Sequence, residues 1–351
     1  MTYVEAMREA FDLCLQNDPN VFLIGEGLPD PKGVFGTTIG LREKYGPDRV
    51  MDMPVSENGM TGICIGAALK GLRPIIVHQR VDFAILCFDQ IINNAAKWHF
   101  MFGGQQSVPL VVRMIVGRGW GQGTQHSQNL QALLAHVPGL KVIAPATAYD
   151  VKGMMIEAVK DNNPVIFIED RWLHGVKDRV PEGVYCVPLG KARIVREGKD
   201  LTLLASGYMV IEAAKAAQVL EQAGIDVELI DLRTIKPLDQ STIDQSVRKT
   251  KRLLVVDSSW LTGGVSAQIV AQVTRELFQE LKAAPERIGL PDTPTPSSPG
   301  LTKNYYPTYA QISQKVFRML VQSPLELEKI LDKHRPSQPH DVPDLNFTGP
   351  F

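Results

Sequence analysis

Three continuous apolar segments limit the fold of this chain most strongly. Residues 74–78, 109–116 and 164–169 are apolar almost throughout, instead of at every second position. Strands of this kind are buried on both faces, which is typical of parallel sheets that carry helices on each side. Segments with the apolar period of an α-helix lie between them. We therefore predict an α/β fold built on a mainly parallel sheet.

The same alternation of strands and helices starts again in the second half of the chain. The connection between the halves is marked by turn residues such as Pro181, Gly183 and Pro188. A chain of 351 residues also exceeds what one core usually holds. We therefore predict two domains, each with a mainly parallel sheet covered by helices: a first domain at 1–175, a linker at 176–199 and a second domain at 200–323. A Pro-rich tail follows at 324–351, and we expect it to lie over the surface or to be disordered.

The hydrophobic periodicity also predicts the individual elements. Strands are expected at 21–26, 49–52, 140–144, 201–206, 226–232 and 252–257. Helices are expected at 2–16, 41–45, 83–101, 130–136, 148–159, 210–223, 241–249 and from 263 to 281. A glycine-rich loop at 117–123 follows one apolar strand directly, and such a loop suits a binding site.

Charge and cysteine content exclude several classes of function. Lysine and arginine number 37 against 38 acidic residues, for a net charge of -1, and no basic run is present. We therefore expect no nucleic-acid or membrane surface, and partners that are proteins or small molecules.

The four cysteines, Cys14, Cys64, Cys87 and Cys186, have no metal-ligand spacing and are interpreted as reduced thiols. The first residues do not resemble a signal peptide, so we expect a cytoplasmic protein.

The segment from Met53 to Met60 contains the first candidate functional residue. Pro54 favours extended chain and Ser56 can cap a helix, so a helix is expected to begin at Glu57. The residues behind it, at 62–68, are mostly glycine and alanine, which suits close packing against a sheet, a helix or a second subunit. A carboxylate in such surroundings has little water around it and is suited to share a proton with a bound ring nitrogen. Alternatively, Glu57 only interacts favourably with the helix dipole.

His126 is the best candidate for a general acid or base. It follows the glycine-rich loop, and Gln125, Ser127 and Gln128 can orient its ring. The alternative is a helix-capping segment in which the imidazole is incidental. Phe83 either stacks on a flat ligand ring or belongs to the core. The sequence has no phosphate-binding loop with lysine, no dinucleotide fingerprint and no cluster of histidine or cysteine suited to a metal.

Taken together, these residues resemble the beta subunit of thiamine-diphosphate-dependent 2-oxo acid dehydrogenases, the group that includes the pyruvate, branched-chain and acetoin enzymes. The resemblance covers roughly residues 2–320. Its most specific segments are DMPVSE at 52–57, GLRPI at 71–75, DQIINNAAK at 89–97, QHSQ at 125–128, HVPGLKV at 136–142, DNNPV at 161–165 and DLRTI at 231–235. The resemblance implies a transketolase-like pyrimidine-binding domain followed by a transketolase carboxy-terminal domain.

The resemblance also implies roles for individual residues. In that family the glutamate matching Glu57 holds a ring nitrogen of the cofactor's aminopyrimidine, and the aromatic residue matching Phe83 lies against the same ring. The histidine matching His126 faces the reaction centre. A structural potassium ion, where the family has one, is implied at the positions of Leu110, Ala158, Val159, Asp161 and Asn163, since carbonyl oxygens and a carboxylate suit a hard cation.

One absence defines the implied partner. The family's motif for diphosphate and magnesium, Gly-Asp-Gly followed by paired asparagines, has no counterpart in this chain and belongs to the alpha subunit. The resemblance therefore implies an α2β2 heterotetramer with thiamine diphosphate and magnesium at the α/β interfaces. It further implies decarboxylation of a 2-oxo acid and transfer of the acyl group to the lipoyl group of an acyltransferase.

The chain departs from the family pattern at three places. The sequence Val77-His-Gln-Arg80 stands where an acidic and an aromatic residue are usual in the family. Residues 98–100 replace a tyrosine-rich segment. The region 291–306, with the pair Tyr305-Tyr306, differs from the usual carboxy-terminal pattern. We expect these changes near substrate or partner surfaces. Two other functions stay open: a transketolase-like or carboligating subunit, and a non-catalytic assembly subunit of the same fold.

Overall fold

The computed structural model describes residues 1–118, 122–320 and 325–334. These residues divide into two compact units, one containing 1–118 and 125–189 and the other containing 122–124, 190–320 and 325–334. Each unit is an α/β structure with its own sheet. The predicted fold class is therefore confirmed.

The sheet of the first unit is parallel and buried, as its apolar strands predicted. Its strands are β1 (Val21–Gly25), β2 (Val50–Met51), β3 (Arg73–His78), β4 (Val111–Val116), β5 (Lys141–Ile143) and β6 (Val165–Asp170). They lie in the order β5-β6-β4-β3-β1-β2, and every neighbouring pair is parallel. The carboxyl ends of all these strands consequently meet at one edge of the sheet, where α/β proteins usually bind their ligands.

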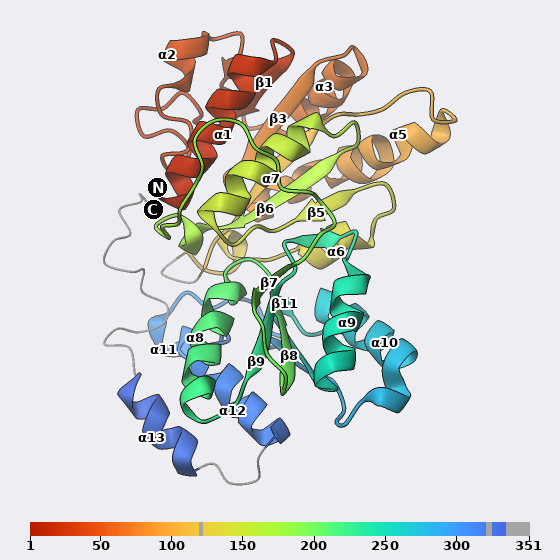
Figure 1. Ribbon diagram of the computed structural model, residues 1–351. Helices are drawn as coiled ribbons and strands as arrows, with labels where there is room; N and C mark the ends of the chain where they lie inside the picture. The colour runs from red at the N-terminus through yellow and green to blue at the C-terminus, as the bar shows by residue number, and fades with distance from the viewer. Residues whose placement is uncertain (119–121, 321–324, 335–351) are drawn as a thin grey trace. The chain divides into compact units, whose positions relative to one another are not determined.

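Helices cover this sheet. They are α1 (Tyr3–Asn17), α2 (Leu41–Tyr45), α3 (Glu57–Leu69), α4 (Val81–Ala84), α5 (Ala96–Met101), α6 (Gln131–His136) and α7 (Ala148–Lys160). The first helix begins where Thr2 and Glu5 form a reciprocal capping box. α1 packs along α7 on one face of the sheet (Figure 1). α3 packs on β3.

The single helix that the sequence predicted at 83–101 is interrupted. After α4 the chain forms a 3-10 turn, η1 (Ile85–Cys87), and a π-helical segment, η2 (Gln90–Ala95), before α5 begins. The wide turn is closed by a bond from the Ala96 N–H to the carbonyl of Ile91, and the Asn93 amide donates to Asp89 at 2.6 Å. Periodicity alone could not predict this change, because a π-segment adds only one residue to a helical turn.

The second unit has the sheet order β12-β11-β8-β9-β7. Its strands are β7 (Arg193–Arg196), β8 (Leu201–Ala205), β9 (Val227–Asp231), β11 (Leu253–Trp260) and β12 (Glu286–Leu290), and a further short strand is β10 (Thr234–Lys236). Its helices are α8 (Met209–Gln222), α9 (Gln240–Thr250), α10 (Val265–Leu277), α11 (Pro299–Thr302), α12 (Tyr309–Leu320) and α13 (Leu325–Lys333). α8 and α12 lie on one side of the sheet and α9 and α10 on the other (Figure 1).

Three features of this unit differ from the expectation. The predicted linker contains β7, an exposed edge strand that runs antiparallel to β9. The predicted tail begins with α13, which packs on α8 and buries Leu327 and Leu331, while residues 335–351 lie outside the described residues. The pair Tyr305 and Tyr306 is buried in an apolar cluster with Leu290, so it does not form a substrate surface.

Candidate active site

Glu57 lies at the carboxyl edge of the first sheet. It is the first residue of α3, as the sequence predicted, and only 5% of it is exposed. Ser56 occupies the cap position with non-helical backbone, but its side chain makes no capping hydrogen bond. The capping role predicted for Ser56 is therefore wrong, and Glu57 starts a helix whose first N–H groups are not covered by that hydroxyl.

Two further carboxylates lie near Glu57. Burial, followed by the charges of Glu57 and Asp52, raises the pKa of Glu26 above its ordinary value. Asp52 is fixed by hydrogen bonds at 3.0 Å from the N–H groups of Gly27 and Met53. Glu26 was not among the candidate residues predicted from the sequence, although its position directly after a buried strand was a signal. The three carboxyl groups make this part of the edge acidic.

Behind Glu57 lies a buried polar pair. His78 ends β3 and is 2% exposed, and its Nε2 lies 3.6 Å from the Sγ of Cys87. Burial lowers the pKa of His78 to about 4, so its imidazole is neutral at pH 7. The Cys87 thiol, whose pKa burial raises to about 11, donates to the carbonyl of Ala84 at 3.0 Å. Both side chains are therefore buried in the interior of the protein.

Phe83 and His126 lie together. Their ring centroids are 5.3 Å apart and the rings are nearly perpendicular, at 86°. The segment that carries His126 is attached to α4, because the side-chain amide of Gln128 donates to Asp82 at 2.8 Å. Both rings are partly exposed. The structure therefore brings two of the three predicted catalytic and cofactor residues into contact, and α3, which Glu57 begins, packs against the η1 turn directly after α4.

The five residues predicted for potassium converge at the opposite edge of the sheet. Leu110 directly precedes β4, Ala158 and Val159 lie in the last turn of α7, and Asp161 and Asn163 lie in the loop before β6. Their oxygen atoms already accept hydrogen bonds: the Arg73 guanidinium donates to the carbonyls of Val159 at 2.8 Å and Asp161 at 3.1 Å. Lys141 pairs with the Asp161 carboxylate. Since a carbonyl oxygen has a second lone pair, the donor set still fits a hard cation.

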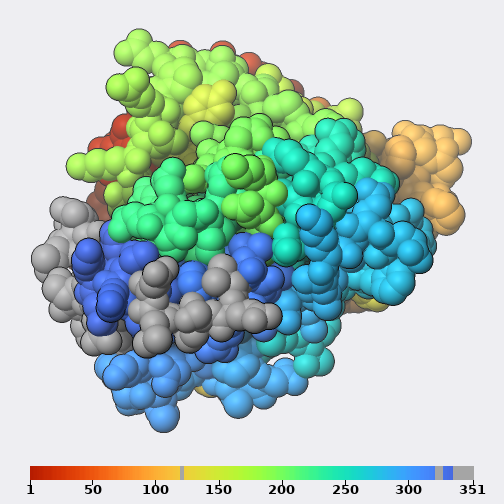
Figure 2. Space-filling view, turned by 60° about the horizontal axis from the view of Figure 1, so that its bottom comes forward, coloured from red at the N-terminus to blue at the C-terminus, as the bar shows by residue number. Residues whose placement is uncertain are grey.

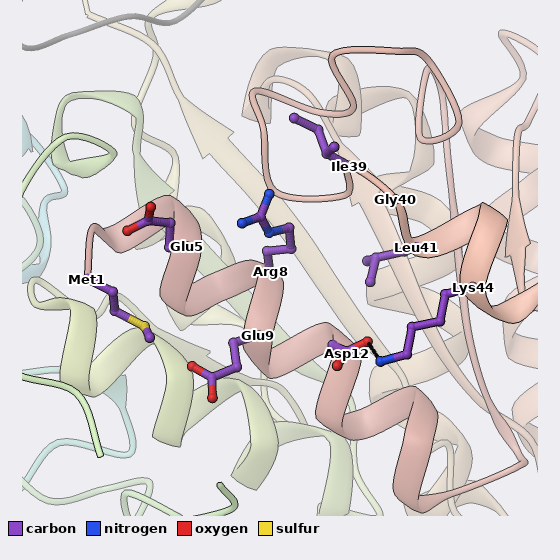
Figure 3. A pocket seen from close by; sticks show the side chains of 9 residues that line it. All are labelled: Met1, Glu5, Arg8, Glu9, Asp12, Ile39, Gly40, Leu41 and Lys44. Atoms are coloured by element: carbon purple, nitrogen blue, oxygen red, sulfur yellow. Dashed lines mark hydrogen bonds and ion pairs between the residues drawn. The ribbon is translucent and has the colours of Figure 1, made fainter. Parts of the chain in front are cut away.

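A surface cavity of about 580 Å³ lies elsewhere on the first unit (Figure 3). It is lined by Met1, Glu5, Arg8, Glu9, Asp12, Ile39, Gly40, Leu41 and Lys44. An ion pair of 2.5 Å between Lys44 and Asp12 crosses one end of it. None of the predicted site residues lines this cavity, so it is distinct from the candidate active site.

Comparison with known proteins identifies the families of the two domains and several relatives. The family described as the transketolase pyrimidine-binding domain matches residues 1–175, and the transketolase C-terminal domain matches residues 190–312. The beta subunit of acetoin:2,6-dichlorophenolindophenol oxidoreductase from Cupriavidus necator is 46% identical over 318 residues, which are 88% of this chain and 94% of that relative. The beta subunit of the pyruvate dehydrogenase E1 component from Rickettsia felis is 43% identical over 316 residues, covering 90% of this chain and 97% of that relative.

A solved structure shows the same fold at lower similarity. A split-gene transketolase, described as an inactive beta4 tetramer, superposes with a TM-score of 0.76 at 23% identity, covering 91% of this chain and 98% of its own. In the part of the chain that the structure describes, every helix is too short or too polar to span a bilayer.

Proposed function

From the premise that this chain belongs to the family of thiamine-diphosphate-dependent 2-oxo acid dehydrogenase beta subunits, we propose that it supplies the pyrimidine-binding half of an active site. The observation that carries this proposal is the burial of Glu57 at a helix start on the ligand-binding edge of the sheet. The partly exposed ring of Phe83, in contact with His126, supports it.

The residues present fit the aminopyrimidine end of thiamine diphosphate. Glu57 offers a carboxylate that can share a proton with a ring nitrogen, and Phe83 offers a flat apolar face. When bound, thiamine diphosphate supplies the electron sink that decarboxylation of a 2-oxo acid requires. In this proposal the Glu57 carboxylate shares a proton with a nitrogen of the aminopyrimidine ring and so controls the charge of that ring. Phe83 excludes water from one face of the same ring. His126 donates a hydrogen bond or a proton to the oxygen atom of the reacting group.

The described residues do not fit the magnesium ion that accompanies the diphosphate end of the cofactor. Within residues 1–118, 122–320 and 325–334, no group of three or more metal-ligating side chains is present. We therefore propose that an alpha subunit provides this half of the site, in an α2β2 heterotetramer. Exposed apolar side chains support such a partner: Phe100 is 89% exposed near the end of α5, Val55 is exposed before α3, and Ile63 is exposed on α3. Figure 2 shows the end of α5 and the loop after it, in tan, standing out from the first unit.

Calorimetry tests this proposal. Thiamine diphosphate with magnesium is titrated into this chain alone, into the candidate alpha chain alone and into their mixture. We expect binding only to the mixture, because each chain supplies one end of the cofactor site. Tight binding to this chain alone would place the diphosphate site within it and would contradict the heterotetramer.

We also propose that potassium binds at Leu110, Ala158, Val159, Asp161 and Asn163 and stabilises the loop before β6. An ion that binds only the folded chain stabilises it by mass action, so saturating potassium should raise the melting temperature by about 5 °C. The reference is tetramethylammonium chloride at equal ionic strength, because this larger cation cannot enter a carbonyl cage. Equal melting temperatures in the two salts would exclude the site.

Two finer parts of the proposal concern the cellular role. We propose that the acyl group passes to the lipoyl group of an acyltransferase, which is supported by relatives that are named as components of pyruvate dehydrogenase. We further propose a cytoplasmic location. The thiols support it, since all four cysteines are free and three of them are buried.

A further inference from the structure

The chain that leads to His126 cannot by itself fix the imidazole. Glycine occupies every second position from 117 to 123, and glycine restricts the backbone least of all residues. His126 then ends a single 3-10 turn, η3 (Thr124–His126). A catalytic group has to be held accurately, since a displacement of 1 Å can cost about 100-fold in rate. The orientation of His126 therefore depends on its own contacts and on the residues that follow it.

The chain directly after His126 is anchored in the interior. Ser127 and Asn129 are only 2% and 4% exposed, whereas His126 and Gln128 are partly exposed. The Oδ1 of Asn129 accepts a hydrogen bond from the N–H of Gln131 at 3.1 Å, where α6 begins. Buried residues thus attach this segment to the protein, and the side chains of His126 and Gln128 extend from it.

Both of these side chains contact α4, and they do so at neighbouring residues. The ring of Phe83 meets the imidazole of His126 edge to face, and the Oδ1 of Asp82 accepts a hydrogen bond from the Nε2 of Gln128 at 2.8 Å. α4 is itself firmly held, because its first and last residues are fully buried and it packs against β3 and β4. Two contacts on one short helix restrain both the position and the rotation of the segment between them.

The contact between Asp82 and Gln128 is a charge-assisted hydrogen bond, which is stronger than one between neutral groups. Within the described residues it is the only hydrogen bond of the Asp82 side chain, whose second oxygen, Oδ2, is buried without a hydrogen-bond partner. Asp82 also attracts the positive charge of Arg80. A buried oxygen without a hydrogen bond lowers the stability of a fold. Stability alone therefore does not explain why a carboxylate accepts this bond.

Three neighbours of His126 could orient its ring, and the structure distinguishes between them. Gln125 is exposed. The Oγ of Ser127 is buried and has no hydrogen-bond partner in the part of the chain that the structure describes. Gln128 alone of the three has a side chain that is bound to the helix carrying Phe83.

We propose that Asp82, acting through Gln128, is a positioning residue that holds His126 against Phe83, so that the imidazole can donate to the oxygen atom of the reacting group. This inference rests on the function proposed above and explains how one of its catalytic residues is oriented. Loss of the contact should lower kcat, because the imidazole moves. It should leave cofactor binding intact, because Glu57 and Phe83 belong to other parts of the site.

Three nearly isosteric variants test the contact in the assembled enzyme at pH 8. Pyruvate, 3-methyl-2-oxobutanoate and 2-oxoglutarate are assayed with an artificial electron acceptor, and kcat per bound cofactor is compared on the fastest. Gln128→Glu places two carboxylates against each other and should lower kcat by at least about 30-fold. Asp82→Asn keeps an acceptor oxygen and should stay within about 5-fold of the wild type. The double variant Asp82→Asn/Gln128→Glu restores the bond with donor and acceptor exchanged and should recover kcat to within about 3-fold.

Cofactor titration separates positioning from structural damage. A contact that served only the fold would reduce the fraction of assembled enzyme and leave kcat per bound cofactor unchanged. In Gln128→Glu we expect the Kd of thiamine diphosphate, measured by calorimetry, to change less than about twofold while kcat falls. Gln240→Glu is the matched control, because Gln240 donates to Asp244 at 2.6 Å on α9, which carries none of the candidate site residues. Its kcat should equal that of the wild type.

Nuclear magnetic resonance gives a second readout that needs no turnover. The Phe83 ring, 5.3 Å from the imidazole, shifts the signal of the His126 Cε1–H group. This signal is assigned with His126→Gln, and Phe83→Leu gives its position when the contact is absent. Gln128→Glu should move the signal towards the Phe83→Leu position, and the double variant should return it.

The outcomes separate this inference from the function on which it rests. If thiamine diphosphate binds but no 2-oxo acid reacts, the proposed function fails, and the resonance experiment still decides whether Asp82 and Gln128 hold His126. If the wild-type enzyme reacts and Gln128→Glu keeps its kcat per bound cofactor, only the positioning role fails. A double variant that recovers neither kcat nor the resonance position would also overturn the inference.

Discussion

Replacing Glu57 by glutamine should lower kcat of the assembled enzyme by at least about 10³-fold. Glutamine has nearly the same shape, so α3 should still begin at this residue and the subunits should still assemble. The amide cannot share a proton with a ring nitrogen as a carboxylate does, so the cofactor would bind without being activated. Turnover with an artificial electron acceptor measures kcat, and size-exclusion chromatography with light scattering measures assembly.

Glu43→Gln is the matched control for this experiment. Glu43 also lies in the first turn of a helix, α2, but it is exposed and is not one of the predicted site residues. If Glu57 only interacted with the helix dipole, both variants would lose less than about 1 kcal/mol of stability and keep their turnover. Near-wild-type activity in Glu57→Gln would therefore remove the mechanism proposed here.

The sequence was sufficient to predict the parts of the fold that depend on local pattern. Apolar strands such as 74–78 and 164–169 indicated a parallel sheet because burial on both faces leaves no alternation, and the structure has β3 and β6 at these positions. β7 was missed because it is an exposed edge strand, and burial therefore gives it no continuous apolar pattern. α13 was missed because its two buried leucines lie in a polar, Pro-rich region.

The sequence predicted the candidate site only in part. Glu57, Phe83 and His126 were identifiable from their positions at a helix start and after a glycine-rich loop. The contact of Phe83 with His126 depends on how α4 and the later segment pack, which periodicity does not encode. Arg80 and Arg171 lie 91 positions apart in sequence, and the parallel order of β3, β4 and β6 brings both guanidinium groups to the ring of Phe35.

Replacing Glu169 by glutamine should destabilise the chain by about 3–5 kcal/mol, because it leaves a buried guanidinium without its counter-charge. Arg113 is fully buried and holds Glu169 with two hydrogen bonds, of 3.2 Å from Nε and 2.5 Å from one terminal nitrogen. His174 contacts the same carboxylate at 2.8 Å. Chemical denaturation at pH 7, followed by circular dichroism, measures the change in the free energy of unfolding.

Two controls show whether the charge itself is responsible. The double variant Arg113→Met/Glu169→Met removes both charges and should be more stable than Glu169→Gln, since the Arg113 guanidinium is removed together with its counter-charge. Asp12→Asn removes a partly exposed ion pair with Lys44 and should cost less than about 1 kcal/mol. A loss below 1 kcal/mol in Glu169→Gln would show that the buried pair contributes little.

The pH dependence gives an independent check on the same group. Burial raises the pKa of Glu169, but the Arg113 guanidinium and His174 more than reverse this and lower it from 4.5 to about 2. A carboxyl group whose pKa is lower in the folded than in the unfolded chain stabilises the fold at pH values above its pKa in the unfolded chain. This stabilisation is lost as the pH falls from 4.5 towards 2. Glu169→Gln should lack this part of the acid-induced loss. Parallel stability curves for the two proteins between pH 5 and 2 would contradict the assignment, because the loss would then originate from other carboxyl groups.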